Sequence, residues 1–134
     1  MEARDDIARF LAEGPWAVAG ASNDRAKFGN KVLRSYLAAG KGPVYPLNPR
    51  EENVEGQTAY ADLAALPESV RALSIVTPPP ITDRVVEEAI AQGVEYLWMQ
   101  PGAESESAIE AARAQGLTVI AHGPCLLVEL GFPD

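Results

Sequence analysis

Residues 16–22 read WAVAGAS, a short apolar run that passes directly into a glycine. The run Trp16–Ala19 is continuously apolar, which is typical of a strand buried on both faces. Gly20 then favours a tight turn, and Gly29 lies near the start of the next helical pattern. A buried strand that leads through a glycine turn into a helix is typical of nucleotide-binding α/β domains.

Four further apolar runs follow at fairly regular intervals, and helical patterns separate most of them. The runs are Val44–Leu47, Ala72–Val76, Val94–Met99 and Leu117–Ala121. The helical patterns are Arg4–Ala12, Lys31–Ala39, Thr82–Gln92 and Ser105–Gln115, with a weaker one at Tyr60–Leu66. Alternation of strands and helices implies right-handed crossovers and helices on both faces of a sheet. We therefore predict an α/β, Rossmann-like, three-layer domain with a mainly parallel five-stranded sheet.

The chain shows no internal repeat, low-complexity tract or long linker, so residues 1–134 are interpreted as a single domain. In a doubly wound sheet, ligands bind beyond the carboxyl ends of the strands, where the strand order reverses. We expect this crevice at the carboxyl ends of the first and fourth strands.

Composition excludes several functional classes. Apolar residues make up 47% of the chain and charged residues 22%, an ordinary globular balance. The net charge of −8 argues against nucleic acid as a partner, because phosphate backbones require clustered cations. A small phosphate ligand remains compatible with this charge, since it needs only backbone N–H groups and one or two cations.

The single cysteine, Cys125, rules out an intrachain disulfide and a multi-cysteine metal site. Residues 1–6 read MEARDD and lack the features of a signal peptide. No stretch approaches the roughly 20 apolar residues of a membrane span. We expect a soluble cytoplasmic protein that does not interact with membranes.

The strongest chemical signal is the segment from Gly20 to Lys31. Gly20 would let a ligand approach the backbone closely, and the start of the following helix favours an anion. Ser22 offers a hydroxyl, and Lys27 is the preferred cation. The dinucleotide fingerprint G-x-G-x-x-G is absent, because its second and third glycines are missing. A plain turn between strand and helix is the alternative interpretation.

Residues 44–50 read VYPLNPR, at the end of the second predicted strand. An NAD enzyme usually carries an acid here for the ribose hydroxyls. Asn48 and Arg50 stand there instead, and an amide and a cation suit a phosphorylated ribose. A simple Asn-Pro turn explains the same residues equally well.

These segments together resemble the small CoA-binding protein family, whose members share the nucleotide domain of the succinyl-CoA synthetase alpha subunit. The matching pieces are GAS at 20–22 with Lys27 and Gly29, VYPLNP at 44–49, VTPP at 76–79 and WMQPG at 98–102. They follow in order at the ends of successive predicted strands, and the resemblance covers nearly the whole chain.

The resemblance implies that coenzyme A is the ligand. The first loop would hold its phosphates, the segment Pro46 to Arg50 would lie beside the adenosine, and residues after the third and fourth strands would line the rest of the crevice. The expected site comprises Gly20, Ala21, Ser22, Lys27, Gly29, Asn30, Pro46, Asn48, Arg50, Thr77, Pro78, Met99 and Gln100.

Evidence for catalysis in the sequence is weak. His122 and Cys125 lie close together and form a conceivable base and nucleophile, but a buried cysteine and a hydrogen-bonding histidine are the commoner roles. Synthetases that use this domain carry a phosphorylated histidine in a second domain. Residues 1–134 contain neither that domain nor its histidine segment, so ligase activity is not expected.

The sequence therefore predicts a module that binds CoA or an acyl-CoA as a stand-alone carrier, sensor or regulator, without intrinsic catalysis. A protein partner is compatible with this role. The alternatives are an NAD(P)-binding, oxidoreductase-like domain and a CoA-dependent enzyme that needs a partner subunit.

Overall fold

The computed structural model describes residues 2–132, and its centre is a five-stranded parallel sheet. The strands are β1 (Trp16–Ala19), β2 (Val44–Leu47), β5 (Ala72–Ile75), β6 (Tyr96–Met99) and β7 (Thr118–Ile120). All four residues of β1 and of β5 are buried, as expected for the inner strands of a sheet covered on both faces.

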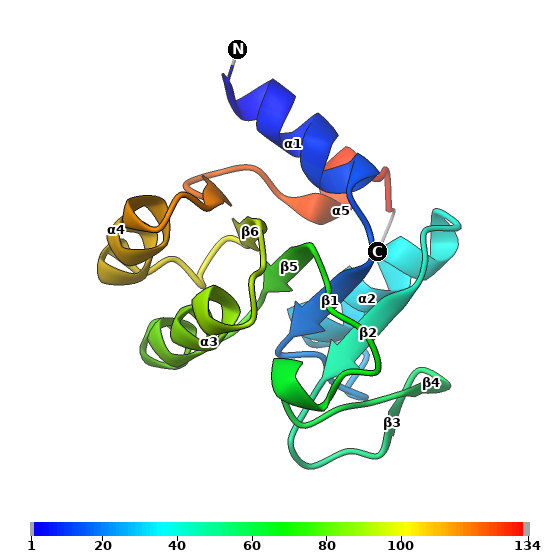
Figure 1. The fold of residues 1–134 in the computed structure, drawn as a ribbon. Helices are drawn as coiled ribbons and strands as arrows, with labels where there is room; N and C mark the ends of the chain where they lie inside the picture. Colours follow the sequence, from blue (N-terminus) through cyan, green and yellow to red (C-terminus); the bar gives the residue numbers. More distant parts are fainter. Residues whose placement is uncertain (1, 133–134) are drawn as a thin grey trace.

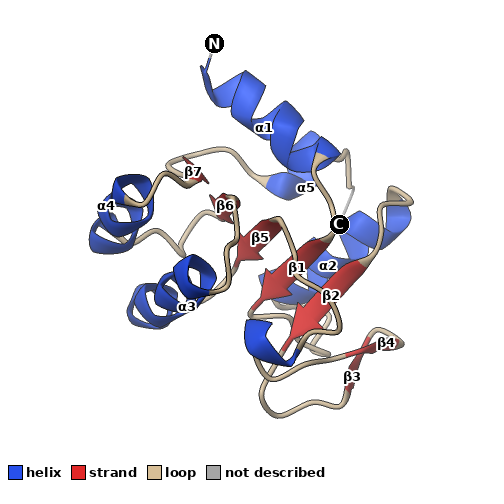
Figure 2. Ribbon diagram, in the orientation of Figure 1, coloured by secondary structure: helices blue, strands red, loops and turns tan. Residues whose placement is uncertain are grey.

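Helices cover both faces of this sheet (Figures 1 and 2). One face carries α1 (Glu2–Ala12), α2 (Phe28–Ala38) and the short α5 (Leu126–Glu129). The other face carries α3 (Pro79–Ala91) and α4 (Glu106–Ala114), which pack against each other. The predicted α/β, Rossmann-like architecture with its parallel five-stranded sheet is therefore confirmed.

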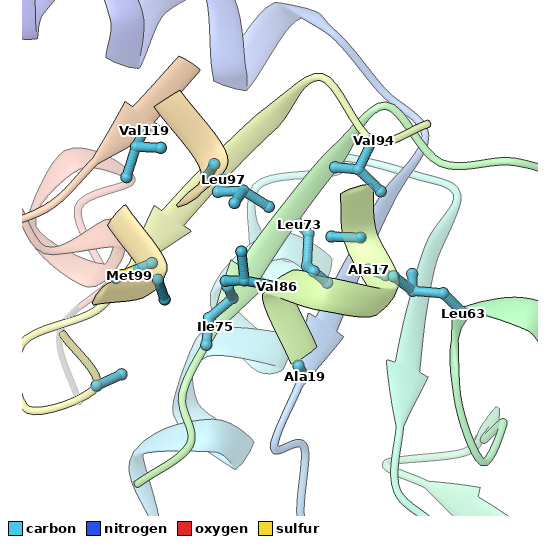
Figure 3. Packing of buried hydrophobic residues seen from close by; sticks show 14 of the residues in the cluster. Ala17, Ala19, Leu63, Leu73, Ile75, Val86, Val94, Leu97, Met99 and Val119 are labelled. Atoms are coloured by element: carbon cyan, nitrogen blue, oxygen red, sulfur yellow. The ribbon is translucent and has the colours of Figure 1, made fainter. Parts of the chain in front are cut away.

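Alternate residues of each strand enter two separate cores. Figure 3 shows the core beneath α3 and α4, where Leu73, Leu97 and Met99 pack with Val86. On the opposite face, the rings of Phe10 and Trp98 pack edge to face, with their centroids 5.2 Å apart. Burial of both apolar faces supplies the main stabilisation of the sheet.

One buried polar pair lies within the second core. The hydroxyl groups of Tyr36 on α2 and Ser74 on β5 are 2.6 Å apart, and both residues are almost fully buried. Burial raises the pKa of the Tyr36 hydroxyl well above its usual value, so it stays protonated and able to hydrogen-bond. The pair fixes α2 against the centre of the sheet.

The strand order is β2-β1-β5-β6-β7. The order reverses between β1 and β5. Helix α2 leads from β1 to β2, which pairs with one edge of β1, whereas β5 pairs with the other edge of β1. The prediction of a crevice at the first and fourth strands is therefore wrong. The switch point lies between β1 and β5, which are the first and third strands of this sheet in chain order.

The segment between β2 and β5 also differs from the prediction. In place of a helix at Tyr60–Leu66, it forms a hairpin, β3 (Asn53–Val54) and β4 (Gln57–Thr58), followed by the short 3₁₀ helix η1 (Leu63–Ala65). Glu55 and Gly56 both have positive φ, as a tight two-residue hairpin turn requires. The side chain of Asp62 caps η1 by accepting from the Ala65 N–H at 3.1 Å.

Helix α3 begins at Pro79, three residues before the predicted start at Thr82, because proline is favoured in the first turn of a helix. None of the described helices is long and apolar enough to cross a bilayer.

Candidate functional site

A groove of about 560 Å³ lies beyond the carboxyl ends of β1, β2 and β5, at the switch point of the sheet. Its floor and one wall come from these strand ends, and its other wall comes from α3. The lining residues are Ala19, Gly20, Ala21, Leu47, Asn48, Pro49, Ala61, Asp62, Thr77, Ile81, Arg84, Val85 and Glu88. A volume of this size is typical of a small-molecule site.

Two glycines allow three backbone segments to meet at the base of this groove. Gly20 has φ +91°, and a Cβ atom there would lie 2.4 Å from the carbonyl oxygen of Val76 at the end of β5. A Cβ atom on Gly29 would lie 1.9 Å from the carbonyl oxygen of Gly20. The chain's own backbone therefore requires both glycines, before any ligand is considered.

The loop between β1 and α2 has an ordered internal structure. The Ser22 hydroxyl accepts from the Asp24 N–H at 3.0 Å, and the Asp24 carboxylate accepts from the Ala26 N–H at 3.0 Å. Asn30 is fully buried, and its side-chain amide donates to the carbonyl of Ser22 at 2.8 Å. Asn30 thus holds the loop to the first turn of α2.

The β3–β4 hairpin holds the same loop from outside. The amide nitrogen of Asn23 donates to the Asn53 carbonyl at 2.7 Å, and its oxygen accepts from the Glu55 N–H at 3.2 Å. The Glu55 carboxylate also accepts from Asn30 at 2.9 Å and pairs with Arg25 at 3.3 Å. These contacts connect two segments that are far apart in the sequence.

The start of α2 is suited to an anion. Lys27 is the N-cap residue, and no side chain caps the first turn within the described part of the chain. The N–H groups of the first turn have no intrahelical acceptor, so they are available to an oxyanion. The side chain of Lys27 is exposed beside them.

Asn48 joins this loop to the end of β2. Its amide nitrogen donates to the Ala21 carbonyl at 2.9 Å, and its oxygen accepts from the N–H groups of Arg50 at 2.7 Å and Glu51 at 3.2 Å. Asn48 therefore shapes the groove wall through contacts within the chain. The side chain of Arg50 is exposed, and Arg50 is not among the residues that line the groove.

The structure brings together only part of the expected site. Four of the expected residues line the groove, namely Gly20, Ala21, Asn48 and Thr77. Ser22 lies in the loop between β1 and α2, Lys27, Gly29 and Asn30 lie at the adjoining start of α2, and Pro78 is exposed as the N-cap residue of α3.

Three more of the expected residues are buried, namely Pro46, Met99 and Gln100. Pro46 lies within the edge strand β2, and Met99 is fully buried in the core of Figure 3. Gln100 is also fully buried, and its oxygen accepts from the Leu126 N–H at 2.9 Å. Their proposed contacts with a ligand stay predictions.

Sequence reasoning missed the groove wall formed by α3. Ile81, Arg84, Val85 and Glu88 follow the spacing i, i+3, i+4, i+7 and so share one face of the helix. This mixed face was visible in the sequence, but its orientation toward a groove was not. Asp62, which precedes η1, is the other charged lining residue that was missed.

Among the described residues, no hydrogen bond joins His122 to Cys125. The His122 ring nitrogen Nε2 lies 2.8 Å from the Glu106 carboxylate, and Cys125 is a half-buried residue at the start of α5. Neither residue lines the groove. Among the described residues, no group of three His, Cys, Asp or Glu side chains is placed to hold a metal ion.

Comparison with known proteins shows the family to which the chain belongs. A family model described as a CoA binding domain matches residues 15–131. The alpha subunit of ADP-forming acetate–CoA ligase II from Pyrococcus furiosus is 35% identical over 107 residues, which cover 79% of this chain and 23% of that subunit. The chain thus spans less than a quarter of this relative.

Solved structures agree with the fold. A hypothetical protein from Pyrococcus horikoshii OT3 superposes with a TM-score of 0.88 at 27% identity, covering 96% of this chain and 89% of the other. The protein cell-free ID.343 from Thermus thermophilus gives a TM-score of 0.85 at 30% identity, covering 96% of both chains.

Replacement of Gly29 by Ala should destabilise the fold, because the added methyl group would lie 1.9 Å from a backbone oxygen. We expect the free energy of unfolding to fall by about 3 kcal/mol or more, as measured by urea denaturation. Gly42→Ala is the matched control, since its Cβ atom would meet nothing within 4 Å. Equal stability of the two variants would show that Gly20 and Gly29 are not in close contact.

Proposed function

The chain belongs to the CoA-binding domain family, and from this membership we propose that it binds coenzyme A or an acyl-CoA in the groove at the switch point. The observation that carries this proposal is the position of the groove, which joins the Gly20 turn to the end of β2 within the matched residues 15–131. Both places are where a Rossmann-type sheet binds a nucleotide.

The distribution of polar and apolar groups supports one orientation of the ligand. The diphosphate would lie at the Gly20 turn and the start of α2. There the backbone N–H groups of the first helical turn would donate hydrogen bonds to it. The adenosine would lie between the Asn48 end of β2 and α3, because Leu47, Ile81 and Val85 offer apolar surface to an aromatic base.

We propose further that the chain acts as a cytoplasmic carrier, sensor or regulatory module without catalysis of its own. The lack of a hydrogen bond between His122 and Cys125 among the described residues supports this role, since a nucleophile and its base must be within hydrogen-bond reach. The lone cysteine is consistent with a reducing compartment.

Obstruction of the groove should abolish CoA binding. Ala61 is an exposed loop residue on the groove wall, so Ala61→Trp fills the groove without disturbing the contacts of Gly20. We expect calorimetry to show at least a tenfold loss of CoA affinity, about 1.4 kcal/mol or more.

The matched control is Ala114→Trp, at the exposed end of α4 and away from the groove. It should bind CoA as the wild-type protein does. Wild-type affinity in a folded Ala61→Trp protein would exclude this groove as the CoA site, and tighter binding of NAD than of CoA by the wild type would overturn the proposal.

Cys125→Ser should leave CoA affinity within about threefold, roughly 0.7 kcal/mol, because the thiol lies outside the groove. Mass spectrometry should find no covalent CoA adduct on the wild-type protein under reducing conditions. A much larger loss of affinity, or such an adduct, would assign the thiol a direct role.

A second candidate function is the CoA-binding part of a CoA ligase, and the name of the Pyrococcus furiosus relative favours it. The chain spans 23% of that subunit, so any ligase activity would require residues beyond those that match. Purified protein incubated with CoA, ATP and acetate should form no acetyl-CoA. Steady formation of acetyl-CoA by this chain would replace the binding role with an enzymatic one.

A further inference from the structure

Arg84 is the one cation among the described residues that line the groove. It lies in the second turn of α3, on the same helix face as Ile81 and Glu88, and its side chain is exposed. It forms no hydrogen bond or ion pair with any other residue in the described part of the chain. A guanidinium at the wall of a ligand groove is therefore left without an anion.

Neither carboxylate that lines the groove forms an ion pair with Arg84 in the described part of the chain, and each accepts hydrogen bonds from the backbone. Glu88 accepts from the N–H groups of Leu63 at 3.1 Å and Ala64 at 3.4 Å, so it is held against η1. Asp62 accepts from the Ala65 N–H at 3.1 Å. Both carboxylates therefore have structural roles at the start of η1.

The backbone at the start of α3 offers no hydrogen-bond donor that could bind an anion in place of Arg84. Pro79 and Pro80 have no N–H group, and the N–H groups of Ile81 and Thr82 both donate to the Pro78 carbonyl, at 2.8 and 3.0 Å. The first turn of α2, by contrast, has no side-chain cap in the described part of the chain, so its N–H groups can donate to an anion. Among the described α3 residues that line the groove, Arg84 alone carries a cationic group for an anion.

The other cations near the ligand path are placed differently. Arg25 pairs with Glu55, and Lys27 lies at the start of α2, beside the proposed diphosphate position. Arg50 follows β2 but does not line the groove. Arg84 lines the groove from α3, the helix whose residues Ile81 and Val85 lie beside the space proposed for the adenosine.

We propose that Arg84 binds a phosphate monoester on the adenosine ribose of the ligand, and so distinguishes CoA from nucleotides with an unsubstituted ribose. This inference rests on the proposed function. A guanidinium can hold a phosphate through two parallel charge-assisted hydrogen bonds. Asp62 and Glu88 would repel the same phosphate in the absence of Arg84, whereas they can accept hydrogen bonds from free ribose hydroxyls.

The test compares CoA with dephospho-CoA, which lacks only this phosphate, by calorimetry at low salt. The wild-type protein should prefer CoA by about tenfold or more. Arg84→Gln should reduce this preference to about one or below, while dephospho-CoA affinity stays near the wild-type value. Arg50→Gln tests the other cation that the sequence suggests for this phosphate and should keep the preference, and Arg84→Lys should keep part of it.

The outcomes separate this inference from the proposed function. Equal affinity of the wild type for both ligands, an unchanged preference in Arg84→Gln, or loss of the preference in Arg50→Gln would overturn the role of Arg84 and leave CoA binding intact. Failure of the wild-type protein to bind either ligand would overturn the proposed function itself. Thermal unfolding of each variant checks that the fold is unchanged.

Discussion

The close approach of the Gly20 turn to its two neighbours is the constraint on which the site depends. A side chain at Gly20 would strike the Val76 carbonyl, and one at Gly29 would strike the Gly20 carbonyl. The ends of β1 and β5 and the start of α2 therefore lie in direct backbone contact. This contact sets the floor of the groove and directs the start of α2 to the same edge of the sheet.

Three asparagine side chains extend this arrangement to the surrounding loops. Asn30 holds the β1–α2 loop to α2, Asn48 holds it to the end of β2, and Asn23 holds it to the β3–β4 hairpin. The amides are largely satisfied within the chain, so they position the site. Among the described residues, no side chain caps the start of α2, which costs stability and leaves donors free for a ligand.

Local charge in this acidic protein is consistent with an anionic ligand. The net charge of −8 opposes nonspecific binding of polyanions, while the groove offers backbone dipoles and the guanidinium of Arg84. The carboxylates of Asp62 and Glu88 lie in the same groove. Binding of an anion would be favoured only beside Arg84 or the start of α2. The groove therefore discriminates between ligands by where their phosphate groups lie as well as by their charge.

The sequence by itself determined the five strands, most of the helices, the Gly20 turn and the resemblance to a CoA-binding family. These features depend on local apolar periodicity and on residues adjacent in the chain, such as those of the run Trp16–Ala19. Four residues of the expected site, Gly20, Ala21, Asn48 and Thr77, could be placed at the groove because each follows the end of a strand.

Only the tertiary structure decided the strand order, the hairpin that holds the β1–α2 loop, and the orientation of Arg84 toward the groove. It also placed Met99 and Gln100 in the interior, where a sequence match could not show their burial. Apolar periodicity predicts that a helix has a buried face. Contacts between segments distant in the sequence decide where on the sheet that helix packs. The position of β5 beside β1, and with it the wall formed by α3, depends on such contacts.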